Sequence, residues 1–380
     1  MASEAASRAQ VVDELFFEQE HPVISGAYRH GWLRTPLTVA RALFSRAGRA
    51  TPGADAFGPG RSVAVVFFEN EHQAVLKVQE RLGIDEIVRL DMRTLPLIRR
   101  TLGLPRLARE TAGFVRDAIR RRGASAWPRL GVPLLGWLLF RTLQTLMARH
   151  AGMRIVTANL QHPLSVAAAH AAKATGQRTV YVEHASTTSA VFADRGCELF
   201  VVDLPHTAAL LEKLGVAPGR IQRIGGEAPP RAAPIVPPVR SVGLCINDLD
   251  STESIWRMVD TLKQAGLDVT LRVHDSDRRM GGFRKMAAER GIHFDSARES
   301  RIQAFFLKVD VVIAGNSNVL GDALRAGKAA LYYWDGDPAV FDYYGLATHY
   351  GIPCAGDPAS LVRLLRPAPA ARERGMNRCA

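Results

Sequence analysis

The chain has 380 residues, of which 47% are apolar and 23% are charged, a composition typical of a soluble globular protein. This length exceeds one ordinary core and predicts two domains. The four cysteines are widely scattered, which argues against a disulfide framework or a paired metal-ligand motif and favours a reducing compartment.

The net charge of +12 is concentrated in one segment. Residues 93–149 contain twelve arginines, no lysine and only two acids, Glu110 and Asp117, so this segment alone carries +10. Such a local patch argues against a general nucleic-acid-binding surface. The first residues lack the pattern of a signal peptide, and no apolar run reaches the roughly 20 residues that span a bilayer. We therefore expect a cytoplasmic protein.

Residues 1–227 predict a first doubly wound domain, because short apolar runs alternate with helical patterns. Strands are expected at 62–68, 86–90, 154–157, 179–182, 199–202 and 221–224. Residues 93–150 form a basic helical insertion in this domain. Within it, residues 131–140 are strongly apolar but too short to cross a membrane. With Arg120, Arg121, Arg122 and Trp127 nearby, this run predicts a surface that rests on the anionic inner membrane. A core helix beside a solvated arginine face is the alternative.

Residues 228–240 contain five prolines and predict a stiff linker between domains. A second alternating series occupies residues 241–366, with strands expected at 242–246, 269–273, 311–314 and 330–333. Residues 367–380 predict a flexible tail. Repeated strand–helix units imply parallel sheets that are covered on both faces. The predicted fold class is therefore α/β, with two doubly wound Rossmann-like domains that face a cleft.

Polar clusters follow two strands of the second domain. One contains Arg272 and His274, and the other is the Gly-Asn-Ser-Asn turn at 315–318, which leads into a helix. Ligands of open parallel sheets bind at the carboxyl ends of strands, and a helix start favours an anion such as a phosphate. An ordinary strand-to-helix turn with an N-cap residue would also explain the second cluster.

These motifs resemble those of GT-B-fold bacterial capsule and cell-surface polysaccharide transferases, including polysialyltransferase-like, Kdo-transferase-like and CDP-glycerol phosphotransferase-like members. Those families carry Arg-x-His-Pro after a strand, matched by Arg272 and His274. They also carry an Asn-Ser-Ser/Thr-Val-x-x-Glu-Ala stretch, matched at 316–323, and a Gln-His pair, matched by Glu183 and His184. The resemblance covers about residues 154–350.

The resemblance implies a metal-independent glycosyltransferase that uses a nucleotide-activated sugar or polyol phosphate as donor. Its acceptor would be a polysaccharide or a lipid-linked glycan, and it would lie peripherally on the inner membrane. The donor-binding residues would be Arg272, His274, Asn316, Ser317, Asn318 and Asp322. The chain departs from the family motifs at Asp275, Asp322 and Glu183. A sugar-nucleotide 2-epimerase of the same fold and a non-catalytic binding protein therefore remain alternatives.

Transfer to an acceptor hydroxyl requires a general base, which is expected on the first domain. The candidates are Glu183 and His184 at one strand end and Glu69 at another. His162, after a third strand, would line the acceptor site. For each residue, a solvated carboxylate or a structurally satisfied histidine is the alternative. No acid or histidine spacing predicts a metal site.

Overall fold

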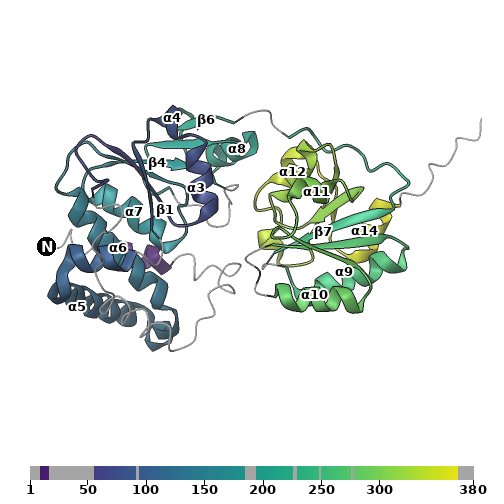
Figure 1. Cartoon of the computed structure of the whole chain (residues 1–380), viewed down its shortest axis with the longest axis horizontal. Coiled ribbons are helices and arrows are strands. Elements are labelled where there is room, and N and C mark those ends of the chain that lie inside the picture. The colour runs from purple at the N-terminus through teal and green to yellow at the C-terminus, as the bar shows by residue number, and fades with distance from the viewer. Residues whose placement is uncertain are drawn as a thin grey trace, which may run out of the picture. The chain divides into compact units, whose positions relative to one another are not determined.

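The computed structural model describes residues 9–16, 55–90, 94–184, 194–225, 229–247, 250–274, 277 and 279–366. The chain divides into two compact units, Met1–Gly226 and Glu227–Ala380 (Figure 1). Each unit contains a six-stranded, wholly parallel sheet. This confirms the predicted α/β class with two doubly wound domains. That the domains face a cleft stays a prediction, and the predicted tail at 367–380 lies outside the described residues.

The sheet of the first unit has the order β2-β1-β3-β4-β5-β6. Its strands are β1 Ser62–Val66, β2 Glu86–Arg89, β3 Arg154–Thr157, β4 Arg178–Val182, β5 Leu199–Val202 and β6 Ile221–Arg223. Its helices are α3 Glu69–Leu76, α4 Gln79–Leu82, α5 Thr94–Arg122, α6 Gly131–Met147, α7 Pro163–Ala174 and α8 Pro205–Lys213, with short 3-10 turns at Ala124–Arg129 and Pro218–Arg220. A further helix covers residues 9–16.

Both faces of this sheet are apolar. Alternate residues of a strand point to opposite sides, and the residues of both sets are apolar here. Val63 and Val65 of β1 belong to the core that contains α6 and α7. Ala64 and Val66 of the same strand belong to the core that contains α3 and α4. This arrangement explains why the strands could be predicted from the sequence. A strand that is covered on both faces has a continuous run of apolar residues.

The prediction that the apolar run at 131–140 rests on a membrane is wrong. This run lies in α6, which packs between α5 and α7, and Trp137, Leu138 and Leu139 are fully buried (Figure 1). Gly136 permits the close approach, because a Cβ there would lie 3.0 Å from the Pro163 carbonyl oxygen. A helix that is apolar on nearly all sides needs to be buried, and here the core of the first unit buries it. No helix in the described parts of the chain is long and apolar enough to cross a membrane.

The sheet of the second unit has the order β12-β11-β10-β7-β8-β9. Its strands are β7 Ser241–Ile246, β8 Asp268–Val273, β9 His293–Ser296, β10 Val311–Ala314, β11 Ala329–Tyr333 and β12 Cys354–Ala355. Its helices are α9 Thr252–Gln264, α10 Met280–Glu289, α11 Ile302–Phe306, α12 Val319–Arg325, α13 Leu346–Tyr350 and α14 Pro358–Leu365, with a 3-10 turn at Pro338–Val340. Helices α9, α10 and α14 cover one face, and α11, α12 and α13 cover the other.

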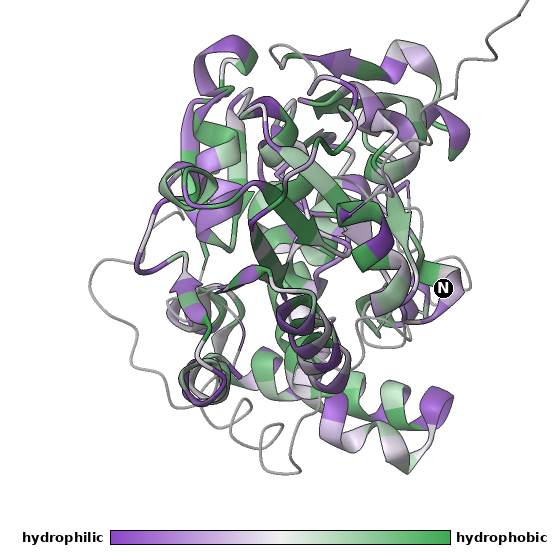
Figure 2. Ribbon diagram, turned by 90° about the vertical axis from the view of Figure 1, so that its right-hand side faces the viewer, coloured by the Kyte–Doolittle hydropathy of each residue, from purple (hydrophilic) through white to green (hydrophobic). Residues whose placement is uncertain are grey.

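The hydropathy of the chain follows these layers, with apolar strands inside and polar stretches on the outer helices (Figure 2). The proline-rich residues 229–240 form no helix or strand. Ile235 and Val239 pack against the core of the second unit, and the Ala232 N–H donates to the Tyr350 carbonyl at 2.8 Å. The stretch is therefore held on the surface of this unit.

Candidate functional site

In each sheet there is one point at which the order in which strands are added reverses. In the first unit, β2 lies on one side of β1, and the next strand in the sequence, β3, lies on the other side of β1. In the second unit, β7 leads to β8 on one side, and the chain later returns to β10 on the other. Ligands of doubly wound sheets bind at the carboxyl ends of the strands at this switch point. The side chains that follow β1 and β3, and those that follow β7 and β10, are thus the two candidate sites.

The switch point of the second unit is tied together by hydrogen bonds between its two strand ends. After β7, the Asn247 side-chain amide donates to the Asn316 carbonyl at 3.1 Å. The Asn247 backbone N–H donates to the Asp250 carboxylate at 2.8 Å. Burial raises the pKa of Asp250 to about 6, although this N–H and the nearby Arg279 act in the opposite direction. Gly315 makes room, because a Cβ there would lie 3.2 Å from Asp250 Oδ1.

Arg279 holds the loop between β7 and α9 in place. Its guanidinium donates to the carbonyls of Asn247 and Asp250 at 2.8 and 2.7 Å. It also pairs with the buried Asp277 carboxylate at 2.7 Å. The sequence analysis did not identify this arginine, since its main partners are backbone carbonyls about 30 residues earlier in the chain. It fixes the backbone that lines the switch point.

The predicted phosphate contact of Arg272 stays a prediction, and the structure gives this side chain partners within the fold. Arg272 is buried and pairs with Asp295 of the neighbouring β9 at 3.0 Å. Its guanidinium also donates to the side chain and carbonyl of Ser300. Strand alternation directs this side chain into the helical layer beneath the sheet rather than toward the edge. His274 follows β8 and is exposed, so its predicted role in donor binding stays a prediction.

The Asn316 side chain also forms hydrogen bonds within the fold. It is 3% exposed, its side-chain amide donates to the Val340 carbonyl, and its oxygen accepts from the Tyr332 hydroxyl and the Tyr343 N–H. These partners occupy both acceptor positions of the amide oxygen and one of its two N–H donors. The predicted donor contact of Asn316 stays a prediction, and its side chain has a clear structural role.

The two residues that follow remain candidates. Among the described residues, the Ser317 hydroxyl accepts one long hydrogen bond, 3.4 Å, from the Val319 N–H. The Asn318 Oδ1 is buried and has no hydrogen-bond partner within the described chain. An unpaired buried oxygen of this kind is costly unless a ligand or water satisfies it. Asp322 lies on the next turn, exposed and paired with Arg325 at 3.1 Å, and its ligand contact stays a prediction.

The switch point of the first unit is built on Glu71, which the sequence analysis also missed. This carboxylate is fully buried and accepts the backbone N–H groups of Phe67 and Phe68 at 2.7 and 3.3 Å. Burial raises its pKa. The only sequence signal was an acid three residues after the N-cap position of α3, as in a capping box. The result is a fixed turn that leaves the Phe68 side chain 43% exposed.

His162 lies beside this turn. It is the N-cap of α7, where its Nδ1 accepts the Leu164 N–H, and its ring lies edge-on to Phe68 with centroids 5.0 Å apart. The Asn159 side chain holds the approach to it by accepting the N–H groups of Gln161 and His162. Burial lowers the pKa of His162 to about 4, so its imidazole is neutral at physiological pH.

Glu183 and His184 follow β4, but only His184 is directed toward the end of β3. Burial lowers the pKa of His184 to about 4, and its ring is hydrogen-bonded to the Ala158 carbonyl. Its Nδ1 has no hydrogen-bond partner in the described structure. Glu183 instead accepts hydrogen bonds from the N–H groups of Asp203 and Leu204 and from the Thr207 hydroxyl, all at the start of α8. Burial raises the pKa of Glu183 to about 7.

Glu69 lies in the first turn of α3 and is exposed. It pairs with Arg89 at 2.5 Å and accepts from Gln73, and both hydrogen bonds lower its pKa. A lowered pKa makes a carboxylate a weaker base. The lowered pKa of His162 and His184 makes them weaker bases as well, and what distinguishes His184 is a buried ring nitrogen that has no hydrogen-bond partner in the described structure. No cluster of acids, histidines and cysteines in the described ranges is placed to hold a metal ion.

No protein-family model matches the sequence, and no curated protein matches it. Solved structures that resemble the chain include the UDP-GlcNAc 2-epimerase of Neisseria meningitidis bound to UDP-GlcNAc, with 10% identity, 80% of this chain and 91% of that chain covered, and a TM-score of 0.44. The UDP-N-acetylglucosamine 2-epimerase of Rickettsia bellii has 9% identity, 80% and 86% coverage, and a TM-score of 0.49. The glycosyltransferase SnogD of Streptomyces nogalater has 15% identity, 82% and 91% coverage, and a TM-score of 0.39. An epimerase and a transferase differ in chemistry, so these likenesses do not decide the activity.

Proposed function

We propose that the protein is a glycosyltransferase that takes a sugar, or a polyol phosphate, from a nucleotide-activated donor and builds a bacterial surface polysaccharide or glycolipid. The observation that carries this proposal is the contrast between the two switch points. One offers hydroxyl and amide groups, and the other offers neutral imidazoles beside an exposed aromatic ring. The sequence resemblance to capsule and cell-surface transferases supports the same assignment.

In this proposal the donor diphosphate lies at the end of β10, in contact with Ser317 and Asn318. The departing nucleotide gains negative charge as the glycosidic bond breaks, and fixed hydrogen-bond donors stabilise that charge. The unpaired Asn318 Oδ1 supports ligand contact at this position, because a hydroxyl of the donor would satisfy it. His274 at the end of β8 completes the donor side.

The acceptor hydroxyl loses its proton to an imidazole of the first unit. His184 is the preferred base, because its Nδ1 lacks a partner and burial keeps the ring neutral. His162 and the exposed Phe68 then form the surface against which the acceptor sugar lies. Glu183 takes second place, since both of its carboxylate oxygens already accept hydrogen bonds.

The remaining partners are part of the proposal as well. The acceptor is a polysaccharide or a lipid-linked glycan, and the protein is cytoplasmic and peripheral on the inner membrane. Attachment to an anionic membrane through residues 93–149 now rests on charge alone, from the arginines of α5 and the exposed Arg129 and Arg149, because the apolar run of α6 lies in the core. Charge without apolar insertion gives weak and salt-sensitive binding.

Donor binding is tested by thermal shift against UDP, CDP, CMP, GDP and their sugar conjugates. A nucleotide at about 100 times its Kd adds roughly 2.7 kcal/mol to the folded state. We expect one nucleotide to stabilise the protein, Asn318→Ala to weaken the shift, and Lys285→Ala, on the exposed face of α10, to leave it unchanged. If no nucleotide shifts the transition at millimolar concentration, the protein is a non-catalytic member of the fold.

The reaction is tested by product analysis with the nucleotide sugar that binds. Transfer predicts free nucleotide and an extended acceptor, whereas a 2-epimerase alters the sugar without consuming an acceptor. We expect His184→Gln to abolish transfer while keeping the nucleotide-induced shift, with the exposed His293→Gln as the control. Full activity of His184→Gln would remove this histidine from the mechanism.

A further inference from the structure

The outer face of α5 presents a straight row of arginines. Arg109, Arg116 and Arg120 are separated by seven and four residues, which places them within about 40° of one another around a helix of 3.6 residues per turn. All three are exposed, while Leu107 and Phe114 on the opposite side are buried. The row therefore faces solvent along its whole length.

This row is short of counter-charge. Arg116 has Asp117 at 3.6 Å, whereas Arg109 and Arg120 form no ion pair with any described residue. The other acid of the helix, Glu110, is buried and pairs with Arg141 at 3.1 Å. Guanidinium groups left in this state attract an external anion.

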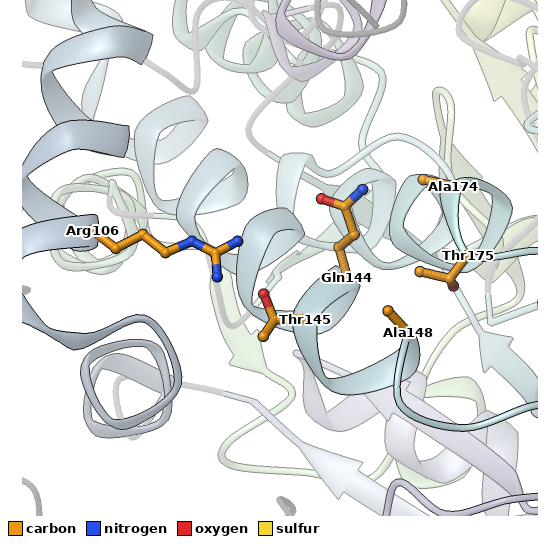
Figure 3. A pocket seen from close by; sticks show the side chains of 6 residues that line it. All are labelled: Arg106, Gln144, Thr145, Ala148, Ala174 and Thr175. Carbon is orange, nitrogen blue, oxygen red and sulfur yellow. The ribbon is translucent and has the colours of Figure 1, made fainter.

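A polar pocket of about 500 Å³ lies at the start of the row, where α6 and α7 end (Figure 3). Its lining residues are Arg106, Gln144, Thr145, Ala148, Ala174 and Thr175. Arg106 precedes Arg109 by about one turn of α5, and its guanidinium extends toward Thr145 and Gln144 (Figure 3). The pocket and the row are thus continuous along one helix.

The pocket offers both donors and acceptors. Gln144 uses its oxygen to accept from Arg141 at 2.6 Å, which leaves its NH₂ group for a ligand. The hydroxyls of Thr145 and Thr175 donate to the Arg141 and Ala171 carbonyls, so their oxygens remain acceptors. Guanidinium and amide donors suit a carboxylate or phosphate, and the threonine oxygens suit sugar hydroxyls.

We propose that this pocket and the arginine row form a binding site for an acidic glycan. One sugar unit lies in the pocket with its anionic group on Arg106, and later anionic groups follow Arg109, Arg116 and Arg120 over about 20 Å at 1.5 Å per residue. The inference rests on the proposed function in one respect, since it takes the acceptor to be a glycan. The site holds the polymer and takes no part in the chemistry at the switch points.

A glycan fits these observations better than a membrane. A bilayer surface cannot enter a concave pocket, and lasting attachment to it needs apolar residues beside the basic ones. The apolar helix of this region is buried in the core instead. Two of the residues between Arg109 and Arg116, Ala112 and Gly113, are too small to insert into lipid, and Phe114 is buried.

The test uses labelled oligogalacturonate, which has one carboxylate per sugar, and its methyl ester, which has none. We expect the acid to bind and the ester to bind at least tenfold more weakly. Arg106→Gln should remove most of this preference. The triple variant Arg109→Gln, Arg116→Gln and Arg120→Gln should weaken binding by up to about fivefold per arginine at low salt and flatten the salt dependence.

The control is a charge-matched triple variant, Lys77→Gln, Lys285→Gln and Arg363→Gln, at exposed positions away from α5. It should bind like the wild type, and all variants should keep the wild-type melting temperature. Equal binding of acid and ester, or wild-type binding by Arg106→Gln, overturns the proposal. Vesicles with anionic phospholipid that bind through the row regardless of Arg106, with no binding of the oligomer, overturn it in favour of a membrane surface.

The two proposals fail separately. If the oligomer binds and no nucleotide shifts the melting temperature, the transferase proposal falls and the glycan site stands. If a nucleotide binds and the oligomer does not, the glycan site falls and the transferase stands. The nucleotide shift of the triple arginine variant should equal that of the wild type, because α5 carries no residue of the donor edge.

Discussion

Replacing Glu183 by Gln distinguishes a structural cap from a catalytic base. Burial raises the pKa of this carboxyl from its ordinary 4.5 to about 7. The ionised form is therefore roughly 3 kcal/mol less stable in the fold than in water. A raised carboxyl pKa contributes stability that is complete below about pH 4.5 and is lost as pH rises through about 7. The wild type should lose up to about 3 kcal/mol from this group between pH 5 and pH 8.

Glu183→Gln removes that loss, because the amide does not titrate. Its oxygen can still accept the Asp203 and Leu204 N–H groups, and the Thr207 hydroxyl can turn to accept from the new NH₂. We expect the variant to match or exceed the wild type at pH 8. Glu183→Ala leaves these donors unsatisfied and should cost about 2–3 kcal/mol at pH 5.

The free energy of unfolding is measured by urea unfolding at pH 5, 6, 7 and 8. Calorimetry and an assay of transferase activity are then carried out on the same variants. Glu198→Gln, at an exposed carboxylate paired with Arg178, is the control and should leave the pH slope unchanged. The reasoning is refuted if wild type and Glu183→Gln show the same pH dependence. Loss of activity in Glu183→Gln with unchanged stability would instead make this residue the base.

Three further outcomes follow from the packing. Gly315→Ala should destabilise the second unit by about 1–3 kcal/mol and weaken nucleotide binding, because the new Cβ would lie 3.2 Å from Asp250 Oδ1; thermal melting measures both effects. Leu139→Ala should cost about 2–5 kcal/mol in urea unfolding, whereas a helix that rests on a membrane would tolerate the change. Burial alone would raise the pKa of Glu14, but the hydrogen bond and charge of His170 and the charge of Arg195 lower it to about 2. Its stabilising effect is thus present above about pH 4.5 and lost toward pH 2, and acid titration of Glu14→Gln should lack that loss.

The sequence predicted the strands that are buried on both faces, because a short continuous run of apolar, β-branched residues is typical of such strands. It missed β9, whose His-Phe-Asp-Ser sequence has one strongly apolar residue and lies at a sheet edge. It also missed the five-residue helices α11 and α13, which are too short to show a helical period. Local pattern therefore located the central strands, while edges and short helices depended on tertiary packing.

The sequence predicted which strand ends the candidate residues follow, but it did not predict which of their side chains are available for a ligand. Arg272 and Asn316 do lie at the ends of β8 and β10, as the strand pattern indicated. Whether such a side chain faces a ligand depends on partners from other strands, here Asp295 for the arginine and Tyr332 for the asparagine. No single-sequence pattern contains those pairings. The same limit hid Arg279, whose role is visible only through the carbonyls that it contacts.

Three buried acids that follow strand ends share one arrangement that bears on the proposed donor. Glu71, Glu183 and Asp250 each turn a carboxylate back onto backbone N–H groups of the neighbouring turn. Burial raises the pKa of all three carboxyl groups. A free carboxylate about 4 Å from a phosphate would cost roughly 1–4 kcal/mol in repulsion. With these three carboxylates turned onto the backbone, hydroxyl, amide and imidazole groups lie at the strand ends beside the exposed Glu69, whose charge is paired with Arg89, and such groups suit the diphosphate and acceptor hydroxyl of the proposed function.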